Sequence, residues 1–512
     1  MNIVSMLNEN AQAYCDKACF IERKATYTYK SVLEQVKKVR QNLIGFGIKK
    51  DIQLILLEPI SSRLYILMMA LWSLGATVVV FDPSATDEYI EKCLERINAN
   101  YFIGCKKAML LRFKLKSIRR IPHAHTVDAM MSFITDIDDL FSPVELSEDS
   151  PALITFTSGR TGNPKVAVRT HGFLLKQYEV IVSTMDYQDT DMDLAVLAIF
   201  TLVNMARGIT TVIPSESLSD IAKINSRVLV QQMFQTKVTR ITTSPMLLKR
   251  VIDYAFAHHI VLPSMRRLNI GGGPVFPFML NNMNAVFPNA TLYLVYGSTE
   301  AEPIAEIKNE DIQGESIAKM QQGYGLIGGY VVNQIECKVI KNNYTKTIGT
   351  LTNNEFSELI LEHEAGEIVV SGGHVLGGYL NGVGDDENKF KVDNICWHRT
   401  GDMGVFDEEN RLWLLGRSSA TIQDARGIVY PFAVESAVYA KYQVNRCAVL
   451  QYQGKRILVV ESNYETKNEI DKDKGNLKID QVIRLRRIPL DIRHRSKIDY
   501  GKLINLIQKD LR

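Results

Sequence analysis

A loop rich in glycine and hydroxyl residues is the part of the chain best suited to chemistry. Residues 155–165 read Thr-Phe-Thr-Ser-Gly-Arg-Thr-Gly-Asn-Pro-Lys and follow an apolar run at 152–154, which predicts a buried strand. Glycines let a backbone approach an anion and turn its N–H groups toward it, hydroxyls add donors, and Lys165 adds positive charge. The composition favours polyphosphate binding. The spacing of these residues is not that of a Walker A loop. A Gly/Pro turn between two strands is the alternative.

Four further motifs follow in the second half of the chain. Tyr-Gly-Ser-Thr-Glu occupies 296–300, Arg-Thr-Gly-Asp-Met-Gly occupies 399–404, Gly-Arg occupies 416–417, and Arg-Ser-Lys-Ile-Asp occupies 495–499. Each is ordinary alone. All five in this order resemble the adenylate-forming superfamily, which includes acyl-CoA synthetases, peptide-synthetase adenylation domains and luciferases. The resemblance spans about residues 25–505.

The resemblance implies an enzyme that uses ATP and Mg²⁺ to activate a small carboxylic acid. Members join the carboxylate to the α-phosphate of ATP, release pyrophosphate, and pass the acyl group to the thiol of coenzyme A or of a carrier's phosphopantetheine. Because both reactants are anionic, charge neutralisation and alignment carry most of such catalysis. Because the acceptor thiol can belong to a carrier's phosphopantetheine, an acyl carrier protein is an expected partner if the acceptor is not coenzyme A.

The resemblance also assigns roles to individual residues. Lys497 is expected to bridge the substrate carboxylate and the α-phosphate, with Lys502 as a neighbour outside the motif. Thr299 and Glu300 are expected to bind phosphate and Mg²⁺, and Thr157 is a second expected metal contact. The expected ATP-binding residues are Thr157, Ser158, Gly159, Arg160, Thr161, Gly162, Lys165, Gly272, Gly273, Pro274, Tyr296, Gly297, Ser298, Asp402 and Arg417.

Alternatives stay open for several of these side chains. Tyr296 suits stacking on adenine, but as an aromatic it suits core packing equally well. Asp402 and Arg417 are expected to bind the ribose hydroxyls, although taken singly an Asp or an Arg is more often a solvated surface residue. The spacing to the other motifs favours the nucleotide roles.

Four positions depart from the family pattern. Arg160 stands where a small hydroxyl residue is usual, so it either adds a phosphate contact or crowds the loop. Val166 replaces glycine, which costs backbone freedom. Ser419 occupies the position of the family's hinge residue, and Gln423 replaces a lysine. These departures motivate the alternative of a catalytically degenerate nucleotide- or acyl-binding protein.

A narrower resemblance concerns the acid. Residues 194–214, 271–275 and 489–494 resemble a subgroup of fatty-acyl ligases that includes the β-lactone synthetases of bacterial long-chain olefin synthesis. The expected acid is therefore a fatty or hydroxy-acyl acid, and capture of its adenylate by a β-hydroxyl is the alternative to thiol transfer. Phe200, Asn204 and Gly271 fall where the acyl pocket is expected.

The elements that must position these residues predict an α/β fold. Strand-like apolar runs alternate with helix-length segments, which favours largely parallel sheets. The predicted strands are 53–57, 76–81, 101–103, 195–202 and 292–296. We expect a large N-terminal domain at 1–417, with two α/β sheet subdomains and a small β subdomain at about 328–400. The resemblance places a small mobile α/β domain, carrying Lys497, at 418–512.

Composition excludes some classes of protein. The formal net charge of +3 is close to neutral and does not indicate nucleic-acid binding. Two basic clusters, at 106–120 and 484–497, are expected to be solvated surface. The second has docking of an acidic carrier as its alternative. Seven scattered cysteines without a CxxC pair favour a reducing compartment, and with no evident secretory signal we expect a cytoplasmic protein.

One apolar segment approaches the length of a membrane span. Residues 64–81 carry no charge. Gly75-Ala76 divides the segment, and the β-branched residues after it suit a strand rather than a helix. We therefore expect a buried helix, a turn and a core strand, and no integral membrane span.

Overall fold

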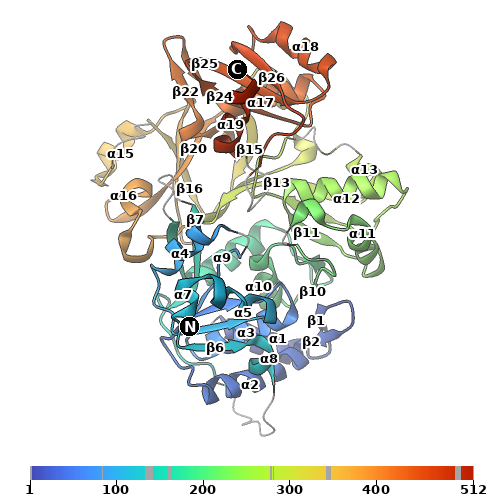
Figure 1. Cartoon of the computed structure of the whole chain (residues 1–512), viewed down its shortest axis with the longest axis vertical. Helices are drawn as coiled ribbons and strands as arrows, with labels where there is room; N and C mark the ends of the chain where they lie inside the picture. Colours follow the sequence, from blue (N-terminus) through green and yellow to red (C-terminus); the bar gives the residue numbers. More distant parts are fainter. Residues whose placement is uncertain are drawn as a thin grey trace. The chain divides into compact units, whose positions relative to one another are not determined.

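The computed structural model describes residues 3–83, 85–132, 142–158, 164–218, 220–276, 280, 282–341, 347–490 and 498–510. Contacts divide the chain into two compact units. Unit 1 comprises Met1–Thr242, Leu262–Arg266 and Gly373–Asp385, and unit 2 comprises Thr243–Val261, Arg267–Gly372 and Asp386–Arg512. Figure 1 shows the chain and labels many of its helices and strands.

The first sheet of unit 1 has the order β6-β5-β3-β4-β7-β8. Its strands are β3 (Gln53–Leu57), β4 (Thr77–Val79), β5 (Tyr101–Gly104), β6 (His123–Thr126), β7 (Pro151–Ser158) and β8 (Pro164–Thr170). Every pair is parallel except β7 with β8. The strands predicted at 53–57, 76–81, 101–103 and 152–154 are confirmed. Parallel strands buried on both faces need such continuous apolar runs.

The segment at 64–81 folds as predicted. Helix α3 (Ser62–Ser73) is buried along nearly its whole length, and Trp72 donates its indole N–H to the carbonyl of Ala152 at 2.8 Å. Gly75 then adopts φ +74°, which glycine permits at low cost, and β4 begins two residues later. In the described part of the chain, no helix has the length and hydropathy that crossing a membrane requires.

A second run of strands in unit 1 corrects one prediction. The order is β11-β9-β10-β1-β2, formed by β1 (Ala18–Ile21), β2 (Thr26–Thr28), β9 (Met192–Leu194), β10 (Thr210–Val212) and β11 (Arg240–Thr243). The predicted strand 195–202 is wrong, because most of it belongs to helix α10 (Ala198–Arg207). Periodicity cannot separate a buried helix from a buried strand in an apolar run this short. Gly208, at φ +79°, ends the helix.

Unit 2 contains a sheet of the order β16-β18-β20-β21-β15-β14-β13-β12. Only β12 and β13 pair in parallel along this path, so the prediction of largely parallel sheets holds for unit 1 and not here. The strands are β12 (Arg267–Ile270), β13 (Thr291–Ser298), β14 (Ala301–Lys308), β15 (Leu326–Val331), β16 (Glu336–Ile340), β17 (Thr350–Leu351), β18 (Gly366–Ser371), β19 (Lys389–Val392), β20 (Ile395–Phe406) and β21 (Arg411–Arg417). Those from β16 to β20 fall in the segment predicted as a small β subdomain.

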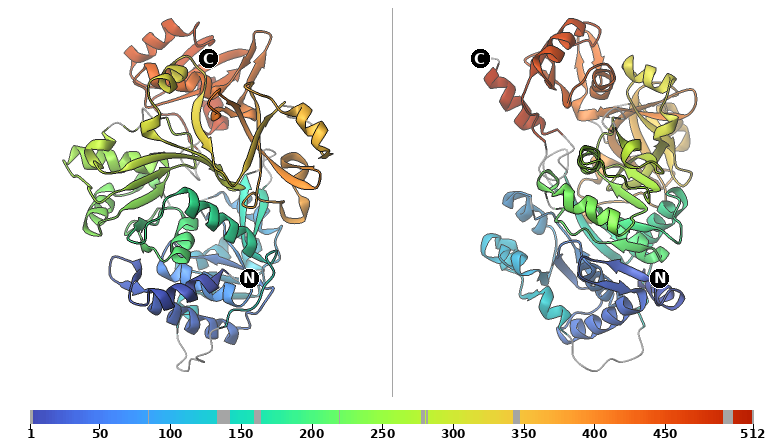
Figure 2. Two further views of the ribbon diagram at one scale, coloured as in Figure 1. Left: turned by 180° about the vertical axis from the view of Figure 1, so that it is seen from behind. Right: turned by 90° about the vertical axis from the view of Figure 1, so that its right-hand side faces the viewer.

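The C-terminal segment of unit 2 builds a small α/β layer. A three-stranded sheet of β24 (Arg446–Tyr452), β25 (Lys455–Glu461) and β26 (Gln481–Arg484) is joined by helices α17 (Pro431–Lys441), α18 (Tyr464–Asp473) and α19 (Tyr500–Asp510), red and orange in Figure 2. The hairpin β22 (Ile422–Asp424) with β23 (Gly427–Val429) precedes them. The boundary predicted at Ser418 lies inside unit 2, and the mobility of 418–512 stays a prediction.

The remaining α-helices connect and cover the sheets. They are α1 (Val4–Ala13), α2 (Tyr29–Gly45), α4 (Asp87–Leu94), α5 (Lys106–Met109), α6 (Leu111–Lys114), α7 (Lys116–Arg119), α8 (Val127–Met131), α9 (His171–Thr184), α11 (Ser226–Gln235), α12 (Pro245–Ala257), α13 (Met283–Val286), α14 (Glu315–Gln321), α15 (Asn353–Leu359) and α16 (Asp385–Asn388). The mixture of sheets and helices is the predicted α/β class.

Candidate active site

The predicted phosphate loop closes a hairpin between two antiparallel strands of unit 1. Thr157 at the end of β7 pairs with Lys165 on β8, and Ser158 pairs with Pro164. Gly159, Arg160, Thr161 and Gly162 lie outside the described residues, so their phosphate contacts stay predictions. The strands on either side are described, so both the phosphate role and the plain Gly/Pro turn stay predictions for these four residues.

Lys165 is held in a defined place at the foot of this hairpin. Its side chain is buried, and Nζ lies 5.0 Å from the centre of the Tyr379 ring. Gly384, at φ +102°, lets the chain pass close by, since a β-carbon there would stand 3.1 Å from Cδ of Lys165. A buried ammonium loses rotamer freedom before any ligand binds, so Lys165 presents its charge at low entropic cost.

The departure at Val166 is accommodated by the strand. Val166 pairs with Phe156 across the two strands and is 2% exposed in an apolar cluster. Extended backbone accepts a β-branched residue readily, so the position needs no glycine. Arg96 donates to the carbonyl of Pro164 and holds the start of β8.

In unit 2 three predicted nucleotide residues meet. Asp402 on β20 and Arg417 on β21 are register partners, and Arg417 Nε lies 3.1 Å from Asp402 Oδ1. The Tyr296 hydroxyl, at the end of β13, donates to the other oxygen, Oδ2, at 2.9 Å. Arg417 Nη1 also donates to the carbonyl of Thr400 at 3.0 Å. Two side chains, Tyr296 and Arg417, thus share the carboxylate of Asp402.

The charges of this group are fixed by their contacts. The Asp402 carboxylate raises the pKa of Arg417, so the guanidinium stays charged. Burial, and then the charge of Asp402, raises the pKa of Tyr296 well above its usual value. Tyr296 is therefore a neutral donor, and the group presents a carboxylate and a guanidinium, which suit the hydroxyls of a sugar.

Thr299 and Glu300 form the tight turn between β13 and β14. Ser298 pairs with Ala301, and the N–H of Glu300 donates to the Ser298 hydroxyl at 3.2 Å. Both turn side chains are partly exposed. One carboxylate and a hydroxyl beside phosphate oxygens are a donor set that Mg²⁺ accepts. Among the described residues, no group of three or more His, Cys, Asp or Glu is arranged so that it could hold a metal ion.

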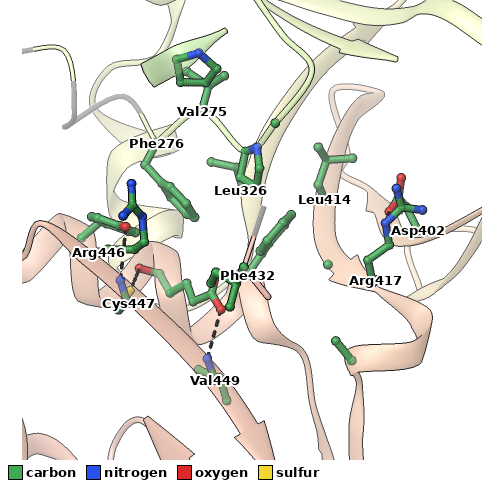
Figure 3. Close-up of a pocket in the computed structure, with 18 of the residues that line it drawn as sticks. Val275, Phe276, Leu326, Asp402, Leu414, Arg417, Phe432, Arg446, Cys447 and Val449 are labelled. Atoms are coloured by element: carbon green, nitrogen blue, oxygen red, sulfur yellow. Dashed lines mark hydrogen bonds and ion pairs between the residues drawn. The ribbon is translucent and has the colours of Figure 1, made fainter. Parts of the chain in front are cut away.

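A cavity of about 830 Å³ in unit 2 joins the predicted nucleotide residues to the C-terminal segment. Figure 3 shows Asp402 and Arg417 on one side of it and Arg446 and Cys447 on the other. Its predicted nucleotide-binding residues are Gly272, Gly273, Pro274, Tyr296, Gly297, Asp402 and Arg417. Its apolar wall includes Val275, Phe276, Leu294, Leu326, Leu414 and Phe432. The volume is in the range of small-molecule sites.

The segment 272–276 lines this cavity, whereas Gly271, predicted for the acyl pocket, is not among the lining residues. Gly272 adopts φ +77°, and a β-carbon at Gly271 would stand 2.8 Å from the carbonyl oxygen of Val295 on β13. Gly271 therefore permits close packing of the backbone. Phe276 stacks on Tyr439 of α17, with ring centres 4.3 Å apart, so this wall of the cavity is rigid.

The comparisons with known proteins agree with the motifs. Residues 7–380 match the model of a family described as AMP-binding enzymes. The chain belongs to this AMP-binding enzyme family. It is 28% identical to an olefin beta-lactone synthetase of Xanthomonas campestris over 93% of this chain and 90% of that protein. A 4-coumarate–CoA ligase of Arabidopsis thaliana is 22% identical over 86% of this chain and 79% of that protein.

Solved structures share the fold. An O-succinylbenzoate coenzyme A synthetase from Bacillus subtilis, in complex with ATP and magnesium ion, superposes with a TM-score of 0.78 at 20% identity, covering 98% of this chain and 99% of that one. This AMP-binding enzyme is therefore an ATP-dependent, adenylate-forming ligase that activates an acid. The resemblance stated from the motifs is confirmed.

Some predicted residues of the AMP-binding enzyme are not brought to a described cavity. Phe200 and Asn204 are buried within unit 1, and the Asn204 amide donates to Asp193 Oδ2 at 3.0 Å and to the Thr211 hydroxyl at 3.1 Å. Their role in an acyl pocket stays a prediction. Lys497 lies outside the described residues, but Ile498 and Tyr500, which follow it, line the cavity.

Glu435 on α17 is a buried carboxyl that lines the cavity and that the motifs did not predict. Glu435 is 2% exposed, and its Oε1 accepts the Val449 N–H at 3.1 Å. Burial raises the pKa of this carboxyl to about 8. Burial and then Glu435 raise the pKa of the Cys447 thiol, so Cys447 is no thiolate nucleophile at neutral pH. In the sequence, the single acidic residue within the largely apolar run 431–438 could have indicated a buried carboxyl.

Proposed function

We propose that this AMP-binding enzyme activates a β-hydroxy fatty acid as its adenylate and closes the adenylate to a β-lactone. The observation that carries the proposal is the Tyr296–Asp402–Arg417 group, which meets an apolar wall in one cavity. Support for the lactone comes from the relative named olefin beta-lactone synthetase, which aligns along nearly the whole chain. The three segments that resemble that subgroup point the same way.

Adenylation is the first step. A carboxylate oxygen of the acid attacks the α-phosphorus of ATP, the bond to the β-phosphate breaks, and pyrophosphate leaves with its electron pair. Asp402 and Arg417 hold the ribose, while Tyr296 closes the adenine side. Lys497 and Lys165 neutralise phosphate charge in this scheme, together with the loop residues Thr157 to Gly162. Glu300 and Thr157 are each predicted to contact Mg²⁺, which would supply charge neutralisation.

Ring closure is the second step. The β-hydroxyl oxygen attacks the acyl carbon, the bond from that carbon to the phosphate oxygen breaks, AMP leaves with the oxygen and the electron pair, and the hydroxyl proton passes to solvent. A four-membered ring is strained, so the acyl group must first carry a good leaving group such as AMP. The apolar wall of Val275, Phe276 and Phe432 suits an alkyl chain and restrains it near the adenylate.

Transfer to a thiol is the second candidate. The relative named 4-coumarate–CoA ligase and the shared fold of a coenzyme A synthetase favour an acceptor such as coenzyme A or a carrier's phosphopantetheine. Ser419, at the family's hinge position, lines the cavity, whereas Gln423 is exposed on β22. In this scheme residues 418–512 turn between the two half-reactions. Scattered cysteines support a cytoplasmic location for either candidate.

One experiment separates these candidates from each other and from a degenerate binding protein. Pyrophosphate release is measured with a β-hydroxy fatty acid and with the same acid lacking the hydroxyl, each with and without coenzyme A. If the lactone proposal is right, both acids release pyrophosphate. A lactone, detected by mass spectrometry, forms only from the hydroxy acid, and its formation does not need coenzyme A. Thioester formation that requires coenzyme A selects the second candidate. ATP binding without pyrophosphate release from any acid would show a degenerate protein.

A further inference from the structure

The segment 106–120 of unit 1, named here the basic ridge, combines positive charge with exposed apolar side chains. It contains seven Lys or Arg and no Asp or Glu. Phe113 is 80% exposed and Leu110 is 62% exposed, and Phe113 is the most exposed large apolar side chain in the part of the chain described. The sequence alone favoured a solvated face here. A solvated face does not require a fully exposed phenylalanine among its charges.

The local structure explains why these two side chains face outward. Leu115 and Ile118 are buried in a core cluster and anchor the ridge to the sheet. Arg119 donates to the carbonyl of Phe113 at 2.6 Å and to that of Arg112 at 3.1 Å, which fixes the turn between α6 and α7. The ridge consists of α5, α6 and α7, which pack beside α4, β5 and β6 (Figure 1). Phe113 therefore projects from a braced turn.

Within the described residues, two of the seven cations on the ridge form an ion pair with an acid. Lys114 pairs with Asp87 at 2.7 Å and Lys106 with Asp128 at 3.3 Å. Glu91 accepts the backbone N–H of Ser117 at 3.0 Å and caps α7. No ion pair with an acid is described for the other five cations of the ridge. These are Lys107, Arg112, Lys116, Arg119 and Arg120.

We propose that the basic ridge docks the protein on an anionic lipid surface. Cations beside a bilayer gain from its negative potential, while Leu110 and Phe113 insert among the acyl chains. The ridge is anchored by Leu115 and Ile118, so it presents both groups without unfolding. An acidic protein or a nucleic acid would use the cations but leaves the aliphatic Leu110 without an apolar partner. The combination of exposed aliphatic, exposed aromatic and unpaired cation thus selects lipid.

The test is sedimentation of the full chain with vesicles. Phosphatidylcholine vesicles are compared with phosphatidylcholine–phosphatidylglycerol vesicles at about 0.1 M and about 1 M salt, where charge screening shortens to ~3 Å. We expect binding only to the anionic vesicles at the lower salt. Each cation near the surface is worth about fivefold in partition, so Lys107→Glu with Lys116→Glu lowers it by about 25-fold or more. Phe113→Ser lowers it by about tenfold, and Phe113→Leu restores it.

Matched controls lie elsewhere on unit 1. Phe234→Ser removes another exposed aromatic, and Arg23→Glu with Lys24→Glu reverses two other exposed cations; both variants keep wild-type partition. Three results overturn the proposal: no binding of the wild type to anionic vesicles at the lower salt, partition that is insensitive to Phe113→Ser, or equally tight binding of polyglutamate or duplex DNA. The proposal does not rest on the enzymatic function, so the two fail independently.

Discussion

Glu435 offers a quantitative test of the cavity's electrostatics. Burial raises the pKa of its carboxyl from 4.5 to about 8. In the folded protein the group keeps its proton across a pH range in which the unfolded chain has lost it. The folded state then binds more protons, so stability falls as pH rises from about 4.5 and stops falling near 8.

The size of the effect follows from the same shift. Each pH unit inside the window changes the free energy of unfolding by about 1.4 kcal/mol, and the whole window amounts to roughly 5 kcal/mol as an upper limit. Glu435→Gln removes the titration and keeps an oxygen that can accept the Val449 N–H. The variant should match the wild type near pH 5 and exceed its stability by several kcal/mol near pH 8.5.

The assay is urea unfolding followed by tryptophan fluorescence at pH values across this window. The quantity compared is the difference between variant and wild type in unfolding free energy, with the m-value checked for constancy. Glu469→Gln, at an exposed acid on α18, is the matched control for the loss of one carboxyl. A flat difference for Glu435→Gln would refute a buried neutral carboxyl at this place.

Three further predictions address the reaction. Lys497→Ala should lower pyrophosphate release by about 100- to 1,000-fold while ATP binding survives, and Lys502→Ala, whose ammonium pairs with Asp499 at 2.8 Å, should be nearly silent; the reverse ranking would reject the assignment. Arg160→Thr should weaken apparent ATP affinity in a titration if the arginine contacts phosphate, whereas a gain in activity would show that it crowds the loop. Ser419→Pro should leave adenylate formation intact and slow transfer to a thiol, measured as separate products; equal loss of both would indicate a folding defect.

The sequence predicted those features that depend on local pattern. The strands at 53–57, 101–103 and 292–296 were found because β-branched and aliphatic runs end in clear turns. The run 195–202 failed because alanine and leucine suit a buried helix as well as a strand. The antiparallel order of the β16–β21 sheet was also missed, since short apolar strands carry no mark of direction.

The candidate site shows the same division between local and long-range information. The motifs identified Tyr296, Asp402 and Arg417. Their spacing in the sequence does not predict that Tyr296 and Arg417 both contact the carboxylate of Asp402. That contact depends on the ladder from β13 through β14, β15 and β21 to β20. Likewise, the exposure of Phe113 and the burial of Glu435 depend on tertiary packing, which a single sequence does not display.

The contacts of Tyr296 and Arg417 with Asp402 also determine which positions on the carboxylate are left for the ribose of a nucleotide. A carboxylate has about four lone-pair positions, and Tyr296 and Arg417 use one on each oxygen. One position on each oxygen therefore remains for a pair of ribose hydroxyls, so the sugar can bind without displacing either protein partner. Both partners hold the carboxylate in a fixed orientation before ligand arrives, which reduces the entropy lost on binding. The fixed carboxylate therefore suits a pair of sugar hydroxyls, and in the proposed scheme the chemistry at the acyl end falls to the predicted phosphate loop and Lys497.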